Sequence, residues 1–120
     1  MAQWAFVEWL LLWLFEFEGF EFDWDRGNAF KSVLKHKVTG REVEEIFRLR
    51  TAMPLGIQIS PPVKDDEKRY GIVGQTSKGR ILMLVFTMRG SKVRVISGRS
   101  ANRKEKRNYE KFLRKIVEGV

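Results

Sequence analysis

The sequence contains no cysteine and only one histidine, His36, among its 120 residues. The absence of cysteine excludes a disulfide framework, a thiol nucleophile and a cysteine-based zinc site. A single histidine also argues against a histidine-rich metal site, because such sites combine several imidazole ligands. We therefore expect a protein without a metal or other cofactor. A reducing, cytoplasmic location suits a chain of this composition.

The sequence also lacks an apolar run long enough to cross a membrane. The longest uninterrupted run covers residues 9–15, whereas a membrane-spanning helix needs roughly 20 residues. No Lys or Arg precedes this run, and a signal peptide requires a basic start and small residues at its cleavage site. We expect neither a membrane span nor an export signal.

Residues 1–19 form a hydrophobic extension whose role the sequence leaves open. They can be an additional helix over an apolar patch, a strand paired with the next segment of the chain, or translated upstream sequence without an evolved role. Residues 15–24 alternate aromatic and acidic side chains around Gly19, which is typical of a strand with one buried face. We expect one folded domain over residues 20–120.

Positive charge is absent from the start of the chain and concentrated in its second half. Residues 1–25 hold six acidic residues and no basic one. Residues 64–115 hold an excess of eleven positive charges, within a net charge of +8 for the whole chain. Such a surface attracts a polyanion or an acidic protein. We prefer that interpretation to a merely solvated face.

The remaining patterns predict a small α+β domain. We expect strands at residues 20–24, 55–59, 70–76, 81–88 and 92–97, and helices near residues 27–36, 40–50 and 100–118. Thr39 and Glu42 have the spacing of a capping box, Pro54 favours an edge strand, and Asp25 and Ser100 can cap the first and last helices. The order predicts an antiparallel meander sheet with two N-terminal helices, one C-terminal helix and one sheet face open to a ligand.

Several short motifs occur in a fixed order over residues 20–112. They are Phe22-Asp23-Trp24-Asp25, Lys35-His36, Glu67-Lys68-Arg69-Tyr70, VRVISGR at residues 93–99 and RKEKRNY at residues 103–109. In this order and spacing they resemble the BrnT family of toxins. The chain departs from the family pattern at Lys37, Gly98 and Lys106, where glycine, alanine and arginine are usual. A lysine in a left-handed helix cap carries a steric cost that glycine avoids.

The resemblance implies a toxin of a type II toxin–antitoxin pair, with a RelE-like fold, that cleaves RNA without a metal and arrests growth. Its implied partner is a BrnA-like antitoxin, in a complex of two toxins and two antitoxins that binds operator DNA only through the antitoxin. The alternative function is a non-catalytic basic module for nucleic acid or an acidic protein. A third possibility is a copy that residues 1–19 make inactive or membrane-associated.

Cleavage of RNA by its own 2′-hydroxyl requires a proton acceptor, charge stabilisation at the phosphate and help for the leaving oxygen. We predict His36 and Glu67 for proton transfer, and Arg69 and Arg94 for holding the phosphate with their planar guanidinium groups. The predicted RNA-binding residues are Trp24, Lys31, Lys35, Arg99 and Tyr109. The two aromatic rings among them can stack on bases.

Plainer roles stay open for these residues. His36 can cap a helix, and Glu67 and Arg69 share a strand face, where they can form a surface ion pair of small energetic value. Trp24 can be a wall of the core, and Arg99 can simply be solvated. The carboxylate beside the arginines separates the two main functions, because a pure binding module needs positive charge alone.

Overall fold

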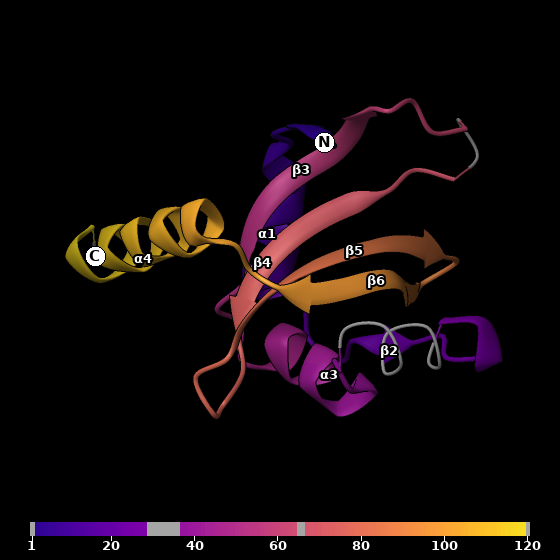
Figure 1. Ribbon diagram of the computed structural model, residues 1–120, viewed down its shortest axis with the longest axis horizontal. Helices are drawn as coiled ribbons and strands as arrows, with labels where there is room; N and C mark the ends of the chain where they lie inside the picture. Colours follow the sequence, from indigo (N-terminus) through magenta and orange to yellow (C-terminus); the bar gives the residue numbers. More distant parts are fainter. Residues whose placement is uncertain (1, 29–36, 65–66, 120) are drawn as a thin grey trace.

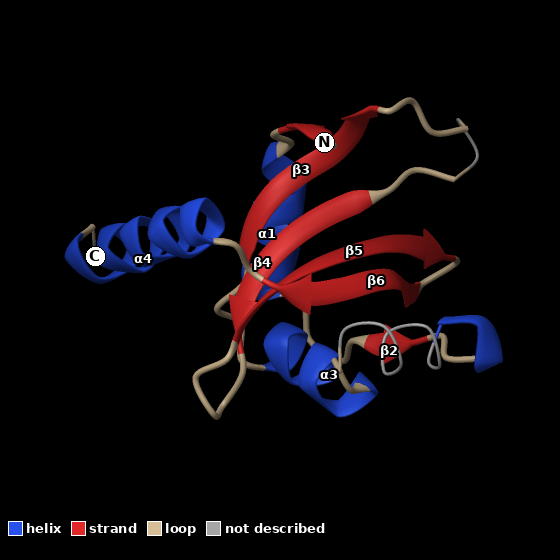
Figure 2. Ribbon diagram, in the orientation of Figure 1, coloured by secondary structure: helices blue, strands red, loops and turns tan. Residues whose placement is uncertain are grey.

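A computed structural model describes residues 2–28, 37–64 and 67–119, which form a six-stranded sheet with helices packed on both faces (Figures 1 and 2). The elements are β1 (Gln3–Ala5), α1 (Glu8–Glu16), β2 (Glu21–Phe22), α3 (Gly40–Arg48), β3 (Met53–Ser60), β4 (Tyr70–Gln75), β5 (Ile81–Arg89), β6 (Lys92–Ser100) and α4 (Arg103–Glu118). The strand order across the sheet is β1-β3-β4-β5-β6-β2.

The sheet is mixed, which confirms the α+β class and corrects the prediction of a wholly antiparallel sheet. Strands β3, β4, β5 and β6 pair antiparallel with their neighbours in chain order. In contrast, β2 lies parallel to β6, with Phe22 beside Val93. Sequence alternation identifies the face that a strand buries and carries no information about the direction in which the strand enters the sheet.

The two faces of the sheet bury separate apolar clusters, because successive side chains of a strand point to opposite sides. On the face covered by α1 and α3, the buried strand residues are Tyr70, Ile72, Leu82, Leu84, Phe86, Val93 and Val95. On the opposite face, which we call the α4 face, the cluster contains Val73, Met83, Ala101 and Tyr109, with Val85, Phe112 and Leu113 packed against it. Helix α4 extends past one end of the strands, so it covers only part of its face (Figure 1).

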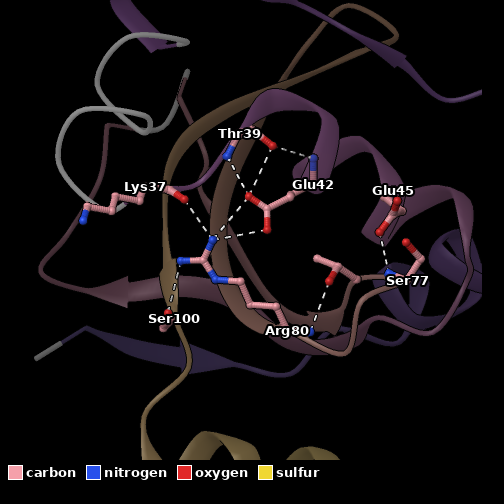
Figure 3. Close-up of polar contacts among 8 residues, drawn as sticks. Lys37, Thr39, Glu42, Glu45, Ser77, Arg80 and Ser100 are labelled. Atoms are coloured by element: carbon pink, nitrogen blue, oxygen red, sulfur yellow. Dashed lines mark hydrogen bonds and ion pairs between the residues drawn. The ribbon is translucent and has the colours of Figure 1, made fainter.

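Helix α3 begins at the predicted capping box. The Thr39 side chain accepts a hydrogen bond from the Glu42 backbone N–H, and the Glu42 carboxylate accepts one from the Thr39 N–H. One turn further on, the Glu45 carboxylate accepts a hydrogen bond from the backbone N–H of Ser77 in the β4–β5 turn (Figure 3). The buried residues of the helix are Val43, Ile46 and Phe47, which are those the sequence pattern indicated.

Arg80 joins three segments around the start of α3 (Figure 3). Its Nη1 donates to the Lys37 carbonyl at 2.8 Å and to both carboxylate oxygens of Glu42 at 3.2 and 3.3 Å. Its Nη2 lies 3.4 Å from Ser100 Oγ at the end of β6. Lys37 has a φ of 54°, which is the left-handed conformation expected where the family has glycine, and which costs a lysine about 1 kcal/mol.

The end of β6 differs from the prediction. Strand β6 continues to Ser100, and the residue that caps α4 is Asn102, whose side chain accepts from the Glu105 N–H at 2.8 Å. Ser100 therefore does not cap the helix as expected. Backbone pairing with β5, which reaches Leu82 opposite Ser100, holds this residue in the sheet, and the next side chain able to cap takes over.

Residues 3–16 are built into the same sheet and core as the rest of the chain. Strand β1 pairs with β3 over residues 57–60, and Leu10 and Leu14 of α1 are completely or almost completely buried. The ring of Trp13 lies 5.9 Å from that of Phe86 and 5.1 Å from that of Phe20. The strand and the helix considered for the extension thus both occur, although residues 15 and 16 end the helix instead of beginning a strand.

Strand β3 accommodates β1 through a glycine. Gly56 has a φ of +133°, and a Cβ atom there would lie 2.0 Å from the carbonyl oxygen of Ala5, so no other residue fits this close approach. Because β1 lies outside β3, β3 is not the edge strand that Pro54 suggested. However, β1 pairs with β3 only over residues 57–60. Within the described chain, Pro54 therefore lies in a part of β3 that has no strand on its β1 side, where the missing N–H of proline costs no hydrogen bond.

The docking of α1 leads to a stability prediction. Leu14 is 2% exposed. The substitution Leu14→Ala should lower the free energy of unfolding by about 2–5 kcal/mol, because it leaves a cavity in the core. Leu12→Ala on the same helix is the matched control, since Leu12 is 47% exposed and should change stability by less than about 0.5 kcal/mol. Urea denaturation of the full chain measures both values. Equal, small effects would show that α1 is not packed on the sheet.

Candidate nucleic-acid interface

Three polar residues lie side by side on the α4 face, near the β5–β6 turn and the start of β4. Figure 1 shows that this turn is at the end of the strands away from α4. Thr87 of β5 pairs with Arg94 of β6. The pairing of Tyr70 with Phe86 brings Arg69, just before β4, to the other side of Thr87. Strands in a sheet are about 4.8 Å apart, so the two arginine backbones flank Thr87 at a separation of roughly 10 Å. We call these three residues the arginine row.

Two carboxylates hold Arg94 in place. Its Nη1 lies 2.9 Å from Asp25 Oδ2 and 3.6 Å from Asp23 Oδ2, and its Nη2 donates to Asp25 Oδ1 at 3.2 Å. Its side chain is only 15% exposed. The hydrogen bond from Arg94 and the backbone hydrogen bond from Asn28 hold the pKa of Asp25 below its usual value, and Asp25 raises the pKa of Arg94. The guanidinium is thus kept charged and oriented.

Asp25 also caps the first turn of a helix, as predicted. Its Oδ1 accepts from the backbone N–H groups of Gly27 and Asn28 at 2.8 and 3.2 Å. Asn28 returns the contact, accepting from the Asp25 N–H and donating to the Asp23 carbonyl, both at 2.8 Å. The carboxylate that orients Arg94 is therefore fixed by backbone hydrogen bonds on its other side.

Arg69 stands on a segment that Thr87 anchors. The buried hydroxyl of Thr87 donates to the Lys68 carbonyl at 2.6 Å, which ties the start of β4 to the middle of the row. Glu67 Oε1 lies 4.0 Å from Arg69 Nη2, and both side chains are partly exposed. An open pocket of about 270 Å³ is lined by Gln58, Pro61, Pro62, Val63, Lys64, Glu67 and Arg69. A ligand on the row thus has room beside Arg69.

The two arginines share a feature that no other described residue has. In residues 2–28, 37–64 and 67–119, Arg69 Nε and Arg94 Nη1 are the buried side-chain nitrogen or oxygen atoms without a hydrogen-bond partner. The 2.9 Å contact of Arg94 Nη1 with Asp25 is an ion pair outside hydrogen-bond geometry. Since buried polar groups are normally hydrogen-bonded, these two atoms distinguish the arginine row from the rest of the described chain.

The predicted RNA-binding aromatics lie elsewhere. Tyr109 is a residue of α4 that is fully buried against the sheet, and its hydroxyl donates to the Thr51 carbonyl at 2.7 Å. Burial raises the pKa of Tyr109 and leaves no ring face for a base, so the expected stacking role is wrong. Trp24 packs on the core with its Nε1 donating to Glu44 at 2.7 Å, which corresponds to the wall of the core considered for it.

Arg99 lies on the α4 face near the start of α4, opposite Met83 and distant from the arginine row. It forms a two-pronged ion pair with Glu105 at 2.7 and 2.9 Å. Three further predicted residues, Lys31, Lys35 and His36, lie outside the described residues.

Asp23, Asp25 and Thr87 were missed as site residues. A signal for the aspartates was present, because both belong to the Phe22-Asp23-Trp24-Asp25 motif. Thr87 carries no chemical signature in the sequence, and only the register of β5 against β6 reveals its place. Within the described ranges, no three His, Asp or Glu side chains gather as metal ligands. No helix of the described chain is long and apolar enough to cross a bilayer.

A mixed sheet that carries arginines beside carboxylates on one face defines a small basic α+β protein. A search of curated proteins gives no match. The sequence profile of the family described as "Ribonuclease toxin, BrnT, of type II toxin-antitoxin system" matches residues 24–105. The chain therefore belongs to the BrnT family of ribonuclease toxins, as its motifs indicated. Membership implies an RNA substrate and an antitoxin partner.

The fold is also similar to a solved structure. The crystal structure of the Brucella abortus ribonuclease toxin BrnT, at 1.1 Å resolution, superposes with a TM-score of 0.50 and 24% sequence identity. The match covers 71% of this chain and 100% of that chain. Residues 1–23 precede the part of the chain that the family profile matches.

The Arg99–Glu105 pair predicts a pH dependence. Burial alone would raise the pKa of Glu105, but hydrogen bonds from Arg99 and from the Asn102 N–H outweigh it and keep the pKa below the usual 4.5. The stability from this group is therefore complete above about pH 5 and is lost as the pH falls through the lowered folded-state pKa. Glu105→Gln should cost roughly 1 kcal/mol at pH 7 and nothing at about pH 2.

Urea denaturation of wild type and variant between pH 2 and pH 7 measures this difference. Glu110→Gln, an exposed change on the same helix, should leave stability unaltered at every pH. A constant difference between the Glu105 variant and wild type across the range would contradict the assigned ion pair.

Proposed function

We propose that this chain cleaves RNA at the arginine row without a metal, through attack of the 2′-hydroxyl on the adjacent phosphate, and that a BrnA-like antitoxin neutralises it. The observation that carries this proposal is the pair of buried arginine donors, Arg69 Nε and Arg94 Nη1, without hydrogen-bond partners. They face the same side of the sheet across Thr87. Membership of the BrnT family supports the same substrate class.

The row suits the phosphate at the bond that is cut. A phosphate placed over Thr87 can accept from a guanidinium group on either side, and charge-assisted hydrogen bonds of this kind are the strong ones. Negative charge grows on the phosphate oxygens as the 2′-oxygen attacks. Fixed positive groups stabilise that state without reorganising, and Asp23 and Asp25 keep Arg94 fixed.

Proton transfer is assigned to the predicted carboxylate and histidine. Glu67 lies beside Arg69, 4.0 Å from its Nη2, within reach of a 2′-hydroxyl next to a phosphate on the row. It would accept that proton, and the leaving 5′-oxygen must then receive one from a second group. His36 is the proposed second group. The products are a cyclic 2′,3′-phosphate and a free 5′-hydroxyl, so the bond count balances without an added reactant.

Residues beyond the row contribute to binding RNA. Lys31 and Lys35 are proposed phosphate contacts, and Arg99 adds positive charge near the start of α4. Arg103, Lys104, Lys106 and Arg107 in the first half of α4 supply sequence-independent attraction. We further propose that the active chain works in the cytoplasm and forms a complex of two toxins and two antitoxins, with operator DNA bound through the antitoxin.

A non-catalytic RNA-binding module is the second candidate. Glu67 is 48% exposed and its contact with Arg69 is long, which are the features of an ordinary surface ion pair. In that case Glu67 would have no role in proton transfer, and the row would bind phosphate without cutting the chain.

Removing either arginine of the row should separate these functions. Arg69→Gln and Arg94→Gln should each lower the rate of RNA cleavage roughly a hundredfold, because each removes a donor to the developing charge. Arg41→Gln, an exposed arginine on α3, is the control and should cleave at the wild-type rate. Cleavage of a labelled RNA with EDTA present measures the rates, and growth after induction tests toxicity.

The Glu67→Gln variant completes the comparison. Loss of cleavage with retained RNA affinity supports proton transfer by this carboxylate. Folded wild-type protein that binds the RNA and leaves it intact, with or without EDTA, would reject the nuclease and leave the binding module.

A further inference from the structure

A groove separates the N-terminal segment from α4, and none of its lining residues belongs to the arginine row. It has a volume of about 350 Å³. Phe6, Leu11, Met53 and Phe112 supply apolar side chains along it, and Lys111 and Lys115 of α4 stand at its border. The ring of Phe15 lies 6.1 Å from that of Phe112, which joins α1 to α4 beside the groove.

The groove combines exposed apolar surface with charge of one sign. Phe6 is 60% exposed, which is high for a phenylalanine next to a cavity. The exposed part of its ring has no structural role in the fold. Lys111 and Lys115 are exposed and one helical turn apart, so their ammonium groups lie on one side of α4. The helix as a whole carries seven basic and three acidic residues, so a complementary partner must be acidic.

We propose that this groove is the docking site for an acidic amphipathic helix of the antitoxin. An amphipathic helix lays its apolar residues into such a groove and presents its flank to the wall. Two acidic residues one turn apart on that flank, about 6 Å from each other, match the spacing of the two lysines. The identity of the partner rests on the proposed function, whereas the chemistry of the groove rests on its own residues.

Protein fits this groove better than RNA does. The groove is mostly apolar, and its two lysines border it on one side only, whereas RNA needs positive charge along its backbone. The arginine row, which has the buried donors suited to phosphate, shares no residue with the groove, and Met53 of the groove pairs with Val73, four residues along the chain from Arg69. Binding at the groove and cleavage at the row can thus be changed separately.

Charge reversal in the groove tests the proposal. Lys111→Glu with Lys115→Glu should weaken binding of the antitoxin encoded in the same operon by at least roughly tenfold. The matched control is Arg107→Glu with Arg114→Glu, which changes the net charge equally on the same helix but outside the groove lining. This control should alter affinity by less than about threefold. Phe6→Ser, which removes the exposed ring, should weaken binding to a similar extent as the lysine pair.

Calorimetric titration of the full-length variants with the purified antitoxin gives the affinities, and RNA cleavage is measured on the same samples. Wild-type cleavage rates with weakened binding in the groove variants support the proposal. Equal weakening by both charge-reversed pairs, or none by the groove pair, overturns it. Loss of cleavage in a folded groove pair also overturns it, in favour of RNA. If the wild type binds the antitoxin but cuts no RNA, the proposed nuclease activity is rejected. The comparison of antitoxin affinities then still tests the proposed docking site.

Discussion

Phe86 and Thr87 are neighbours on β5 and point to opposite sides of the sheet, and the rest of the molecule depends on this alternation. Phe86 is completely buried between the rings of Trp13 and Phe47, whereas Thr87 occupies the centre of the arginine row. A shift of the strand by one residue would put a hydroxyl in the core and a phenyl ring in the row. The packing of the core therefore sets the register in which the two arginines meet.

Much of this arrangement follows from local patterns in the sequence. The capping box at Thr39 and the apolar stripe of α3 are short-range features, so residue spacing suffices to predict them. The left-handed conformation of Lys37 was indicated only by the glycine that is usual at this position in the family. The sequence also indicated Arg69 and Arg94 as candidates for holding a phosphate, a role that stays a prediction. Family resemblance added the substrate class, which spacing and periodicity alone do not contain.

Features that depend on long-range packing were not predictable in this way. The direction of β2 depends on pairing between residues about 70 apart. Tyr109 has an aromatic ring of the kind that stacks on bases. Only its complete burial between α4 and the sheet excludes that role. The ion pair between Asp25 and Arg94 joins residues that are 69 positions apart in the sequence. Such contacts depend on how helices and strands pack against one another after they have formed. Local patterns in a single sequence carry no information about that packing.

The position of Trp13 and Leu14 in the core has a consequence for how the protein is made. These side chains leave the ribosome before β5, against which they pack, because Phe86 of β5 is synthesised 72 positions after Leu14. At typical rates of 5–20 residues per second, roughly 4–14 seconds separate the two events. During that interval the nascent chain carries an uncovered apolar helix, which is a binding target for chaperones. Arg94 emerges later still, so the arginine row is complete only after β6 has been synthesised.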